Sequence, residues 1–328
     1  MIEISTNDSR ICNPEQVILD LVRAFRHNHN IVISMKGEGP CARSLRLYDL
    51  LDKLCDEFEF LKENITIETC NLIEQHDEYN IIRKPQMFYL NRAKQYYNNI
   101  ASNNKVFDEN FKHVGHFIGH GNKYRLQLAS ALFTNHNTQS LQTYHCDATD
   151  EYHRVHMGIE DMLFGGCTDQ EFDNACKLIK ASPLSLDQID GYPILMPETL
   201  NITKVYPNFF VELTSLTYFS GDTFYVDEKI WRPMLMKTPF MIQGPKDFIT
   251  NLHKLGFKTF GNYWDEGYSQ DDSNCHVPAI IENIKRLSTM SLVELKEMYQ
   301  DMNSILEHNF IRLMSINDQD FKNAFTIR

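Results

Sequence analysis

The sequence predicts an α/β protein with two lobes, each built on a parallel β-sheet, followed by a C-terminal helical tail. Short apolar segments typical of buried strands alternate along the chain with longer segments whose apolar residues recur at helical spacing. Glycine-containing turns follow two of the strand-like segments, as expected for parallel sheets with crossover helices. The 328 residues are enough for roughly two domains of ~150 residues each. We expect lobes over 1–110 and 111–275, and the tail over 276–328.

The first lobe shows a strand, turn, helix, strand order after an initial helix. Apolar residues recur at helical spacing over 16–27, and the run of isoleucine and valine in 30–35 predicts a short buried strand. A Gly-Glu-Gly-Pro turn at 37–40 leads into a helix expected over 43–58. Alternating residues predict the next strand over 65–69.

The second lobe repeats this alternation. Strands are expected over 113–118, 140–144, 208–214 and 239–242. Helices are expected over 124–133, 150–182, 227–236 and 246–255. Two polar, amphipathic helices are expected in the tail, between residues 279 and 314.

Composition limits the classes of function. Apolar residues make up 42% of the chain, enough for packed cores, and no uninterrupted apolar segment approaches the ~18–20 residues of a membrane helix. No secretory signal is visible at the start, so we expect a cytoplasmic protein. The Asn, Ile and Lys usage suggests a bacterium or a virus-infected host cell. The net charge of −12 disfavours general nucleic-acid binding, although a local basic pocket for a diphosphate is compatible with it.

Cysteine and histidine spacing does not predict a metal site. The eight cysteines form no CxxC pair, and the thirteen histidines form no HExxH motif. We therefore expect reduced, mostly buried thiols, no metal, and no cofactor other than a donor substrate.

The segment 209–245 carries the most chemical information. A buried strand ends in a polar loop, an acid–lysine pair then starts a helix, and a second strand ends at Gly-Pro. Free N–H groups at a helix start after a strand favour a bound phosphate. Lys229 adds a positive charge, Glu228 can accept hydrogen bonds from two hydroxyls such as those of a ribose, and Tyr225 can stack on the same ligand.

This segment also resembles a known family. The sequence YVDEKIWRP followed by TPFMIQGP is similar to the donor-binding signature of α1,3-fucosyltransferases and related GT-B glycosyltransferases. Five positions match that signature: Tyr225, Glu228, Lys229, Trp231 and Arg232. Asp227 stands where the family has threonine, and the preceding strand lacks the family's asparagine. Of the matching residues, we assign Trp231 to the core.

Two further segments extend the resemblance over about residues 110–270. Residues 116–133 resemble the family's strand, small-residue turn and helix, in which an arginine contacts the diphosphate; the matching residue is Arg125. An arginine in the first turn of a helix can also bind two phosphate oxygens through its planar fork. Gly119 and Asn122 build the turn, and Asn122 is a further donor-site candidate. Residues 255–269 resemble a segment of phage and bacterial glycosyltransferase-like proteins.

The resemblance implies two Rossmann-like lobes of the GT-B type, with a nucleotide diphosphate sugar bound by the C-terminal lobe without metal. An inverting transfer to the hydroxyl of a glycan or other acceptor needs a base, usually a carboxylate of the first lobe. Glu38 is our candidate for this catalytic role because it lies in the turn after a predicted strand. Glu68 and Glu74 are alternatives. The Trp264-Asp265-Glu266 segment either lines the cleft or caps the tail.

Three other functions remain open from the sequence. The chain could be an inactive nucleotide- or sugar-binding module, as the two departures from the signature suggest. A sulfo- or phosphotransferase could use the same lobes, although no phosphate-cradling loop is present. A viral glycosyltransferase that acts on modified DNA is disfavoured by the acidic charge.

Overall fold

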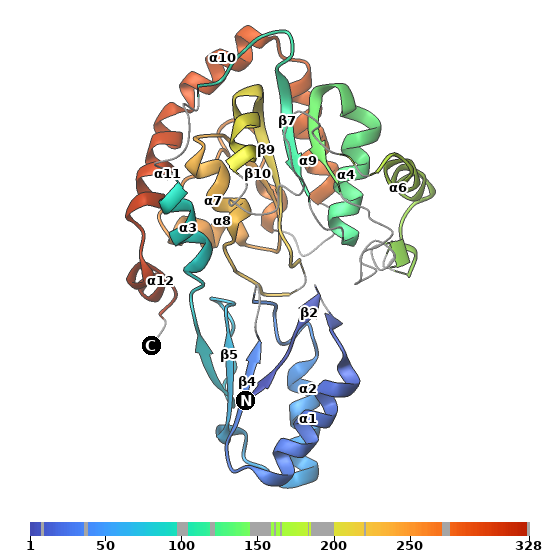
Figure 1. The fold of residues 1–328 in the computed structure, drawn as a ribbon, viewed down its shortest axis with the longest axis vertical. Coiled ribbons are helices and arrows are strands. Elements are labelled where there is room, and N and C mark those ends of the chain that lie inside the picture. Colours follow the sequence, from blue (N-terminus) through green and yellow to red (C-terminus); the bar gives the residue numbers. More distant parts are fainter. Residues whose placement is uncertain are drawn as a thin grey trace.

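The computed structural model shows an α/β architecture with two four-stranded parallel sheets (Figure 1). It describes residues 1–7, 10–35, 39–96, 104–118, 122–144, 159–160, 162–164, 166–182, 184, 200–219, 221–270 and 276–326. The predicted α/β class and the predicted parallel sheets are confirmed. Every helix within these residues is too short or too polar to span a membrane.

The first sheet keeps its strands in chain order. In space they are β1 (Ile2–Glu3), β4 (Ile31–Met35), β5 (Ile65–Thr69) and β6 (Asn80–Arg83). A small hairpin of β2 (Thr6–Asn7) and β3 (Arg10–Ile11) follows β1. The helices α1 (Pro14–His27) and α2 (Leu47–Phe58) pack against each other beside this sheet (Figure 1).

The start of each helix in this lobe has a local cause. Pro14 stands in the first turn of α1, where its fixed φ favours the helix and its missing N–H costs no hydrogen bond. The sequence predicted the second helix from residue 43, but α2 begins at Leu47. Residues 43–46 form a turn in which Arg46 has a φ of 55°, and a right-handed helix cannot continue through that conformation.

The second sheet reverses its strand order. In space its strands are β10 (Phe240–Gln243), β9 (Phe209–Ser215), β7 (Lys112–Phe117) and β8 (Ser140–Thr143). The chain leaves β7 toward β8 on one side and leaves β9 toward β10 on the other. Open parallel sheets bind ligands at such a reversal, beyond the carboxyl ends of the strands. All seven residues of β9 are buried, as expected for a central strand covered on both faces.

Helices on both faces cover the second sheet. They are α3 (Phe88–Tyr96), α4 (Lys123–His136), α6 (Asp169–Ala181), α7 (Glu228–Leu235) and α8 (Phe248–Lys254), together with the C-terminal helices. Within the predicted helical range 150–182, α6 begins only at Asp169, where Thr168 and Glu171 form a capping box. Residues 145–158 lie outside the described part of the chain. The helix α3 packs on α7, although it precedes the second sheet in sequence.

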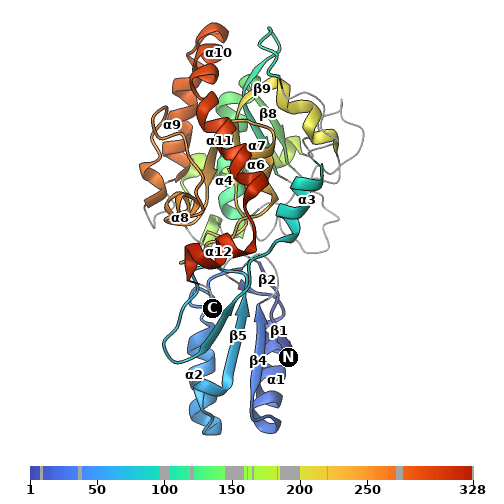
Figure 2. The same ribbon diagram turned by 90° about the vertical axis from the view of Figure 1, so that its left-hand side faces the viewer.

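The C-terminal segment forms four helices, so the prediction of two was wrong. They are α9 (His276–Ser288), α10 (Leu292–Asp301), α11 (Asn303–Ser315) and α12 (Asp318–Phe325). Capping boxes that pair Ser291 with Glu294 and Asn317 with Asp320 start α10 and α12 as new helices. The segment descends along the second sheet to the junction of the lobes, where α12 lies (Figure 2).

We call the part of the chain around each sheet a lobe; the loop 216–227, which connects β9 to α7, is one of the places where the two come into contact. Backbone hydrogen bonds and side chains from the first lobe reach this loop, beginning with Leu72 N–H donating to Phe224 O at 2.9 Å. The rings of Phe224 and Phe325 also contact each other, with centroids 5.1 Å apart. The carboxyl ends of the strands β5 and β9 therefore face the same junction.

Candidate functional site

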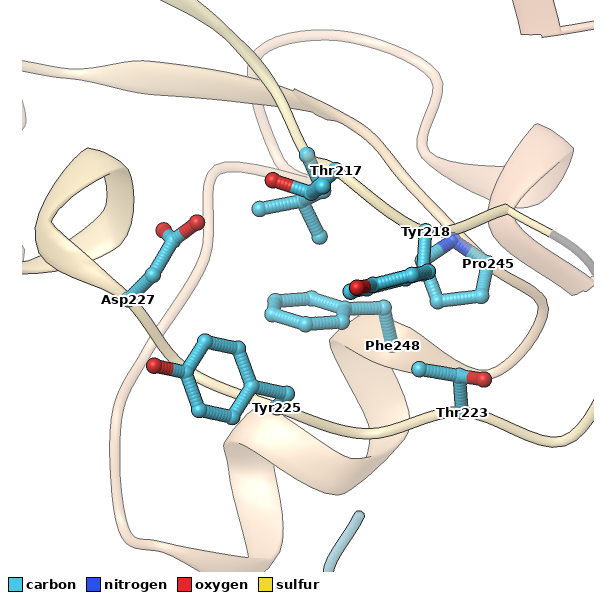
Figure 3. Close-up of a pocket in the computed structure, with 8 residues that line it drawn as sticks. Thr217, Tyr218, Thr223, Tyr225, Asp227, Pro245 and Phe248 are labelled. Atoms are coloured by element: carbon cyan, nitrogen blue, oxygen red, sulfur yellow. The ribbon is translucent and has the colours of Figure 1, made fainter. Parts of the chain in front are cut away.

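A pocket lies beyond the carboxyl ends of β9 and β10. It has a volume of about 210 Å³ that is continuous with solvent. Its lining residues are Leu216, Thr217, Tyr218, Thr223, Tyr225, Asp227, Pro245 and Phe248. Figure 3 shows Tyr225 and Asp227 on one side of the pocket, with Tyr218 and Pro245 on the opposite side. The pocket thus combines aromatic walls with a carboxylate and hydroxyl groups.

Asn122 and Arg125 attach the start of α4 to the loop after β9. The Asn122 side chain caps α4, because its Oδ1 accepts a hydrogen bond from Arg125 N–H at 2.9 Å. Its Nδ2 donates to Thr217 O at 3.1 Å. The Arg125 guanidinium donates from Nε to Leu216 O and from Nη2 to Thr217 Oγ1, both at 2.9 Å. Arg125 is only 7% exposed, so these contacts span the strand-order reversal inside the protein.

Asp227, Glu228 and Lys229 form a charged group at the start of α7. Asp227 caps the helix, because its Oδ1 accepts from Lys229 N–H at 3.0 Å. The Lys229 ammonium donates to Asp227 Oδ2 and to Glu228 Oε1, both at 2.7 Å. The sequence did not identify Asp227 as a site residue, although aspartate is a favoured cap residue before a helix.

The two cations predicted to act together lie behind the wall of one pocket, and neither lines it. Arg125 contacts Thr217, Lys229 contacts Asp227, and both of these contacted residues line the pocket. Tyr225 lines it directly. The structure therefore brings the five candidate donor-binding residues to one end of the second sheet. The proposed base Glu38 lies outside the described residues, as does Gly119.

Comparisons with known proteins give no match: no family model fits the chain, and no curated protein or solved structure is significantly similar to it. The interpretation of the pocket therefore depends on its geometry and its chemistry. Within the described residues, no group of three or more His, Cys, Asp or Glu side chains is arranged to hold a metal ion.

A buried polar network lies beneath the pocket. His116 Nε2 is 3.0 Å from Ser215 Oγ, and that hydroxyl donates to Gln243 Oε1 at 2.7 Å. Gln243 Nε2 donates in turn to Tyr124 O in the first turn of α4 at 2.9 Å. The network joins β7, β9 and β10 to the helix that carries Arg125, and so it supports the position of that helix start. Burial, together with the nearby Arg125 charge, lowers the pKa of His116 to about 3.

The low pKa of His116 predicts acid sensitivity. An unfolded histidine binds a proton below about pH 6.5, whereas folded His116 does so only near pH 3, so stability falls as pH falls through that window. Between pH 6.5 and 4.5, the free energy of unfolding should fall by about 2 kcal/mol less in His116→Gln than in the wild type. Urea unfolding at both pH values measures the difference. His27→Gln, at an exposed position on α1, is the control; equal pH slopes for His116→Gln and wild type would contradict the assignment.

The alternative carboxylates of the first lobe have partners within that lobe. Glu68 Oε2 pairs with the Lys84 ammonium at 2.7 Å. Glu74 is buried and accepts hydrogen bonds from Ala42 N–H, Tyr48 OH and Asn71 Nδ2. Burial raises the pKa of Glu74. Neither carboxylate lines the pocket.

The Trp264-Asp265-Glu266 segment stabilises its own loop and the first helix of the tail. Glu266 accepts hydrogen bonds from Thr259 Oγ1 at 2.6 Å and Phe260 N–H at 3.0 Å. Asn283 Nδ2, on α9, donates to Asp265 O at 2.8 Å. Of the two interpretations of this segment, the structure favours capping of the tail.

Proposed function

We propose that the protein is a glycosyltransferase of the GT-B type that takes a sugar from a nucleotide diphosphate bound at this pocket. One observation carries the proposal: two cations from two helix starts, Arg125 and Lys229, each contact a residue of the same pocket. A leaving diphosphate gains negative charge in the transition state, and fixed positive groups beside it lower the barrier. The strand-order reversal places both cations where parallel sheets bind their ligands.

The other residues suit the remaining parts of such a donor. The aromatic rings of Tyr218, Tyr225 and Phe248 offer surfaces for a base or for the apolar face of a sugar. The carboxylates of Asp227 and Glu228 can accept hydrogen bonds from hydroxyl groups. The enclosed part of the pocket is far too small for a whole nucleotide sugar. We therefore assign one part of the donor to the pocket and the rest to the adjoining loop 216–227.

The acceptor belongs on the side of the first lobe, whose loops reach the pocket loop. We propose an inverting transfer in which a carboxylate base deprotonates the acceptor. No metal is needed in this proposal, because Arg125 and Lys229 supply the positive charge that a departing diphosphate requires. The acceptor is a glycan or another hydroxyl compound, and Glu38 stays our prediction for the base. Titration calorimetry with a panel of nucleoside diphosphates tests the proposal. The absence of binding by every member at millimolar concentration would contradict it.

Lys229→Ala is expected to weaken diphosphate binding much more than nucleoside binding. The ammonium must exchange a carboxylate partner for a phosphate oxygen, and its removal eliminates one charge-assisted contact, worth roughly tenfold in affinity or more. Affinities for a nucleoside and its diphosphate, measured for wild type and variant, give the comparison. Equal losses for the two ligands would show that Lys229 does not contact the phosphates.

Asp227→Asn is the matched variant with the opposite expected effect. Asparagine caps a helix as well as aspartate does, so α7 should still begin at residue 228. The ammonium of Lys229 loses one of its two carboxylate partners and the pocket loses one negative charge. Diphosphate binding should therefore tighten by roughly fivefold at low salt. Weaker binding would mean that hydrogen bonds from the ligand to the Asp227 carboxylate outweigh its repulsion of the phosphates.

One observation favours a second candidate, a binding module without turnover. Lys229 is held by two carboxylates, which offsets the positive charge available for a leaving group. Donor hydrolysis with water as the acceptor separates the two candidates. An inactive module should bind the donor without releasing the nucleoside diphosphate.

A further inference from the structure

All residues that line the pocket belong to the second lobe, but side chains of the first lobe hold part of its wall in place. The loop 216–227 belongs to the second sheet by sequence, and it contributes six of the lining residues. Two of these, Thr223 and Tyr225, follow Asp222 and Phe224 directly in the chain. Both Asp222 and Phe224 are held by one side chain of the first lobe, that of Asn71.

Asn71 uses both ends of its amide group. Its Oδ1 accepts from Phe224 N–H at 2.9 Å and from Ile73 N–H at 3.3 Å. Its Nδ2 donates to Asp222 O at 2.8 Å and to Glu74 Oε2 at 3.2 Å. The side chain is 0% exposed, so each of these bonds replaces one that water would otherwise make. Asn71 therefore fixes the backbone on both sides of Thr223.

Glu74 fixes the orientation of Asn71. Its carboxylate accepts only, so it selects the NH₂ end of the Asn71 amide. The carboxylate is itself anchored, because Oε2 accepts from Ala42 N–H and Oε1 accepts from Tyr48 OH, both at 2.9 Å. A flip of the Asn71 amide would break both of its contacts with the pocket loop.

Two further contacts join the same loop to the first lobe. Thr6 Oγ1, in the hairpin, lies 2.9 Å from the hydroxyl of Tyr218, another residue of the pocket wall. Gly221 has a φ of 69°, and a Cβ at this position would lie 1.9 Å from Ser44 Oγ. Only glycine allows this approach without displacing the neighbouring loop.

We propose that Asn71 is a positioning residue, through which the first lobe sets the shape of the ligand pocket in the second. The identity of the ligand rests on the proposed function, but the positioning of Thr223 and Tyr225 does not. The proposal has a mechanistic consequence. Any motion of one lobe against the other changes the pocket wall, so the acceptor side and the donor side of the protein are coupled.

Hydrogen exchange in Asn71→Ala tests the positioning directly. We expect the Phe224 amide, which loses its Asn71 partner, to exchange at least roughly tenfold faster than in the wild type. The amides of the buried strand β9 should keep their wild-type protection, which excludes general destabilisation. Asn80→Ala is the matched control: this asparagine lies in the same lobe and donates to Thr66 Oγ1 at 3.0 Å, away from the pocket. It should leave Phe224 unchanged.

Ligand affinity provides the second readout. The nucleoside diphosphate that binds the wild type best should bind Asn71→Ala roughly tenfold more weakly and Asn80→Ala equally well. Unchanged exchange at Phe224, or accelerated exchange with full affinity, would overturn the proposal. If no diphosphate binds the wild type, the proposed function fails, and the exchange result alone still decides the role of Asn71. Should Asn71→Ala not fold, Asn71→Ser carries the same expectations with a smaller loss of volume.

Discussion

Arg125→Lys is expected to weaken the binding of a nucleoside diphosphate by roughly 100-fold, although it keeps the positive charge. The expected loss of affinity comes from the geometry of the arginine side chain. The guanidinium donates to Leu216 O and to Thr217 Oγ1 from two nitrogens of one rigid plane. A lysine ammonium is a point charge on a flexible stem and cannot reproduce that fork. These two buried hydrogen bonds, worth about 1–1.5 kcal/mol each, hold Leu216 and Thr217 of the pocket wall, and a loss of this size follows when the ligand must restore the displaced wall on binding.

The same substitution should leave most of the global stability in place. Asn122 caps α4 through the backbone N–H of residue 125, which lysine retains. Calorimetric titration measures the affinity, and thermal unfolding shows that the fold persists. Arg23→Lys, on the exposed face of α1, is the matched control and should bind like the wild type. Full affinity in Arg125→Lys would show that charge alone suffices at this position.

Arg232→Met is expected to lower the free energy of unfolding by about 3–5 kcal/mol, the largest stability effect of any single change proposed for this chain. Arg232, on α7, forms an ion pair with Glu212 in the centre of β9 and donates from Nε to Tyr206 OH at 2.7 Å. Glu212 is 0% exposed. Without the guanidinium, its carboxylate would stay in the core without its ion-pair partner.

A double substitution separates two contributions to the free energy of unfolding: the destabilisation by an isolated buried charge and the stabilisation by the ion pair. Glu212→Leu combined with Arg232→Met removes both charges and should regain much of the stability lost in Arg232→Met. Lys237→Met, which breaks a partly exposed pair with Glu307, should cost no more than about 1 kcal/mol. Urea unfolding gives all three values. A loss below about 1 kcal/mol in Arg232→Met would show that water or a shifted side chain compensates Glu212.

Arg232 has a structural role in the second lobe. It fastens α7 to β9 from inside the lobe, and the first turn of α7 carries Glu228 and Lys229. Trp231, next to it, lies in the core with 1% of its surface exposed. Arg232 and Trp231 therefore hold the helix, while Tyr225 lines the pocket and Lys229 contacts Asp227 in its wall.

Local pattern identified the buried strands of both sheets, including the four-residue β8 and β10, and missed β1, β6 and the hairpin. Periodicity predicted the bounds of the helix α4 and of the strands β4, β5 and β9 to within a few residues. Each of these elements buries a continuous apolar face. The strand β1 has two residues and β6 has four that are only half-buried or exposed, so neither has a recognisable pattern. The break between α10 and α11 was missed because residues 300–304 contain neither proline nor glycine to mark it.

The sequence alone determined the α/β class, the parallel sheets, and the candidate cations Arg125 and Lys229, because these follow from spacing and residue type within single segments. Only the tertiary structure decided which groups meet. Thr217 joins Arg125 across about ninety positions, and Asn71 reaches Phe224 across 153. Such contacts depend on the packing of two sheets end to end, and no pattern confined to one stretch of chain contains that information.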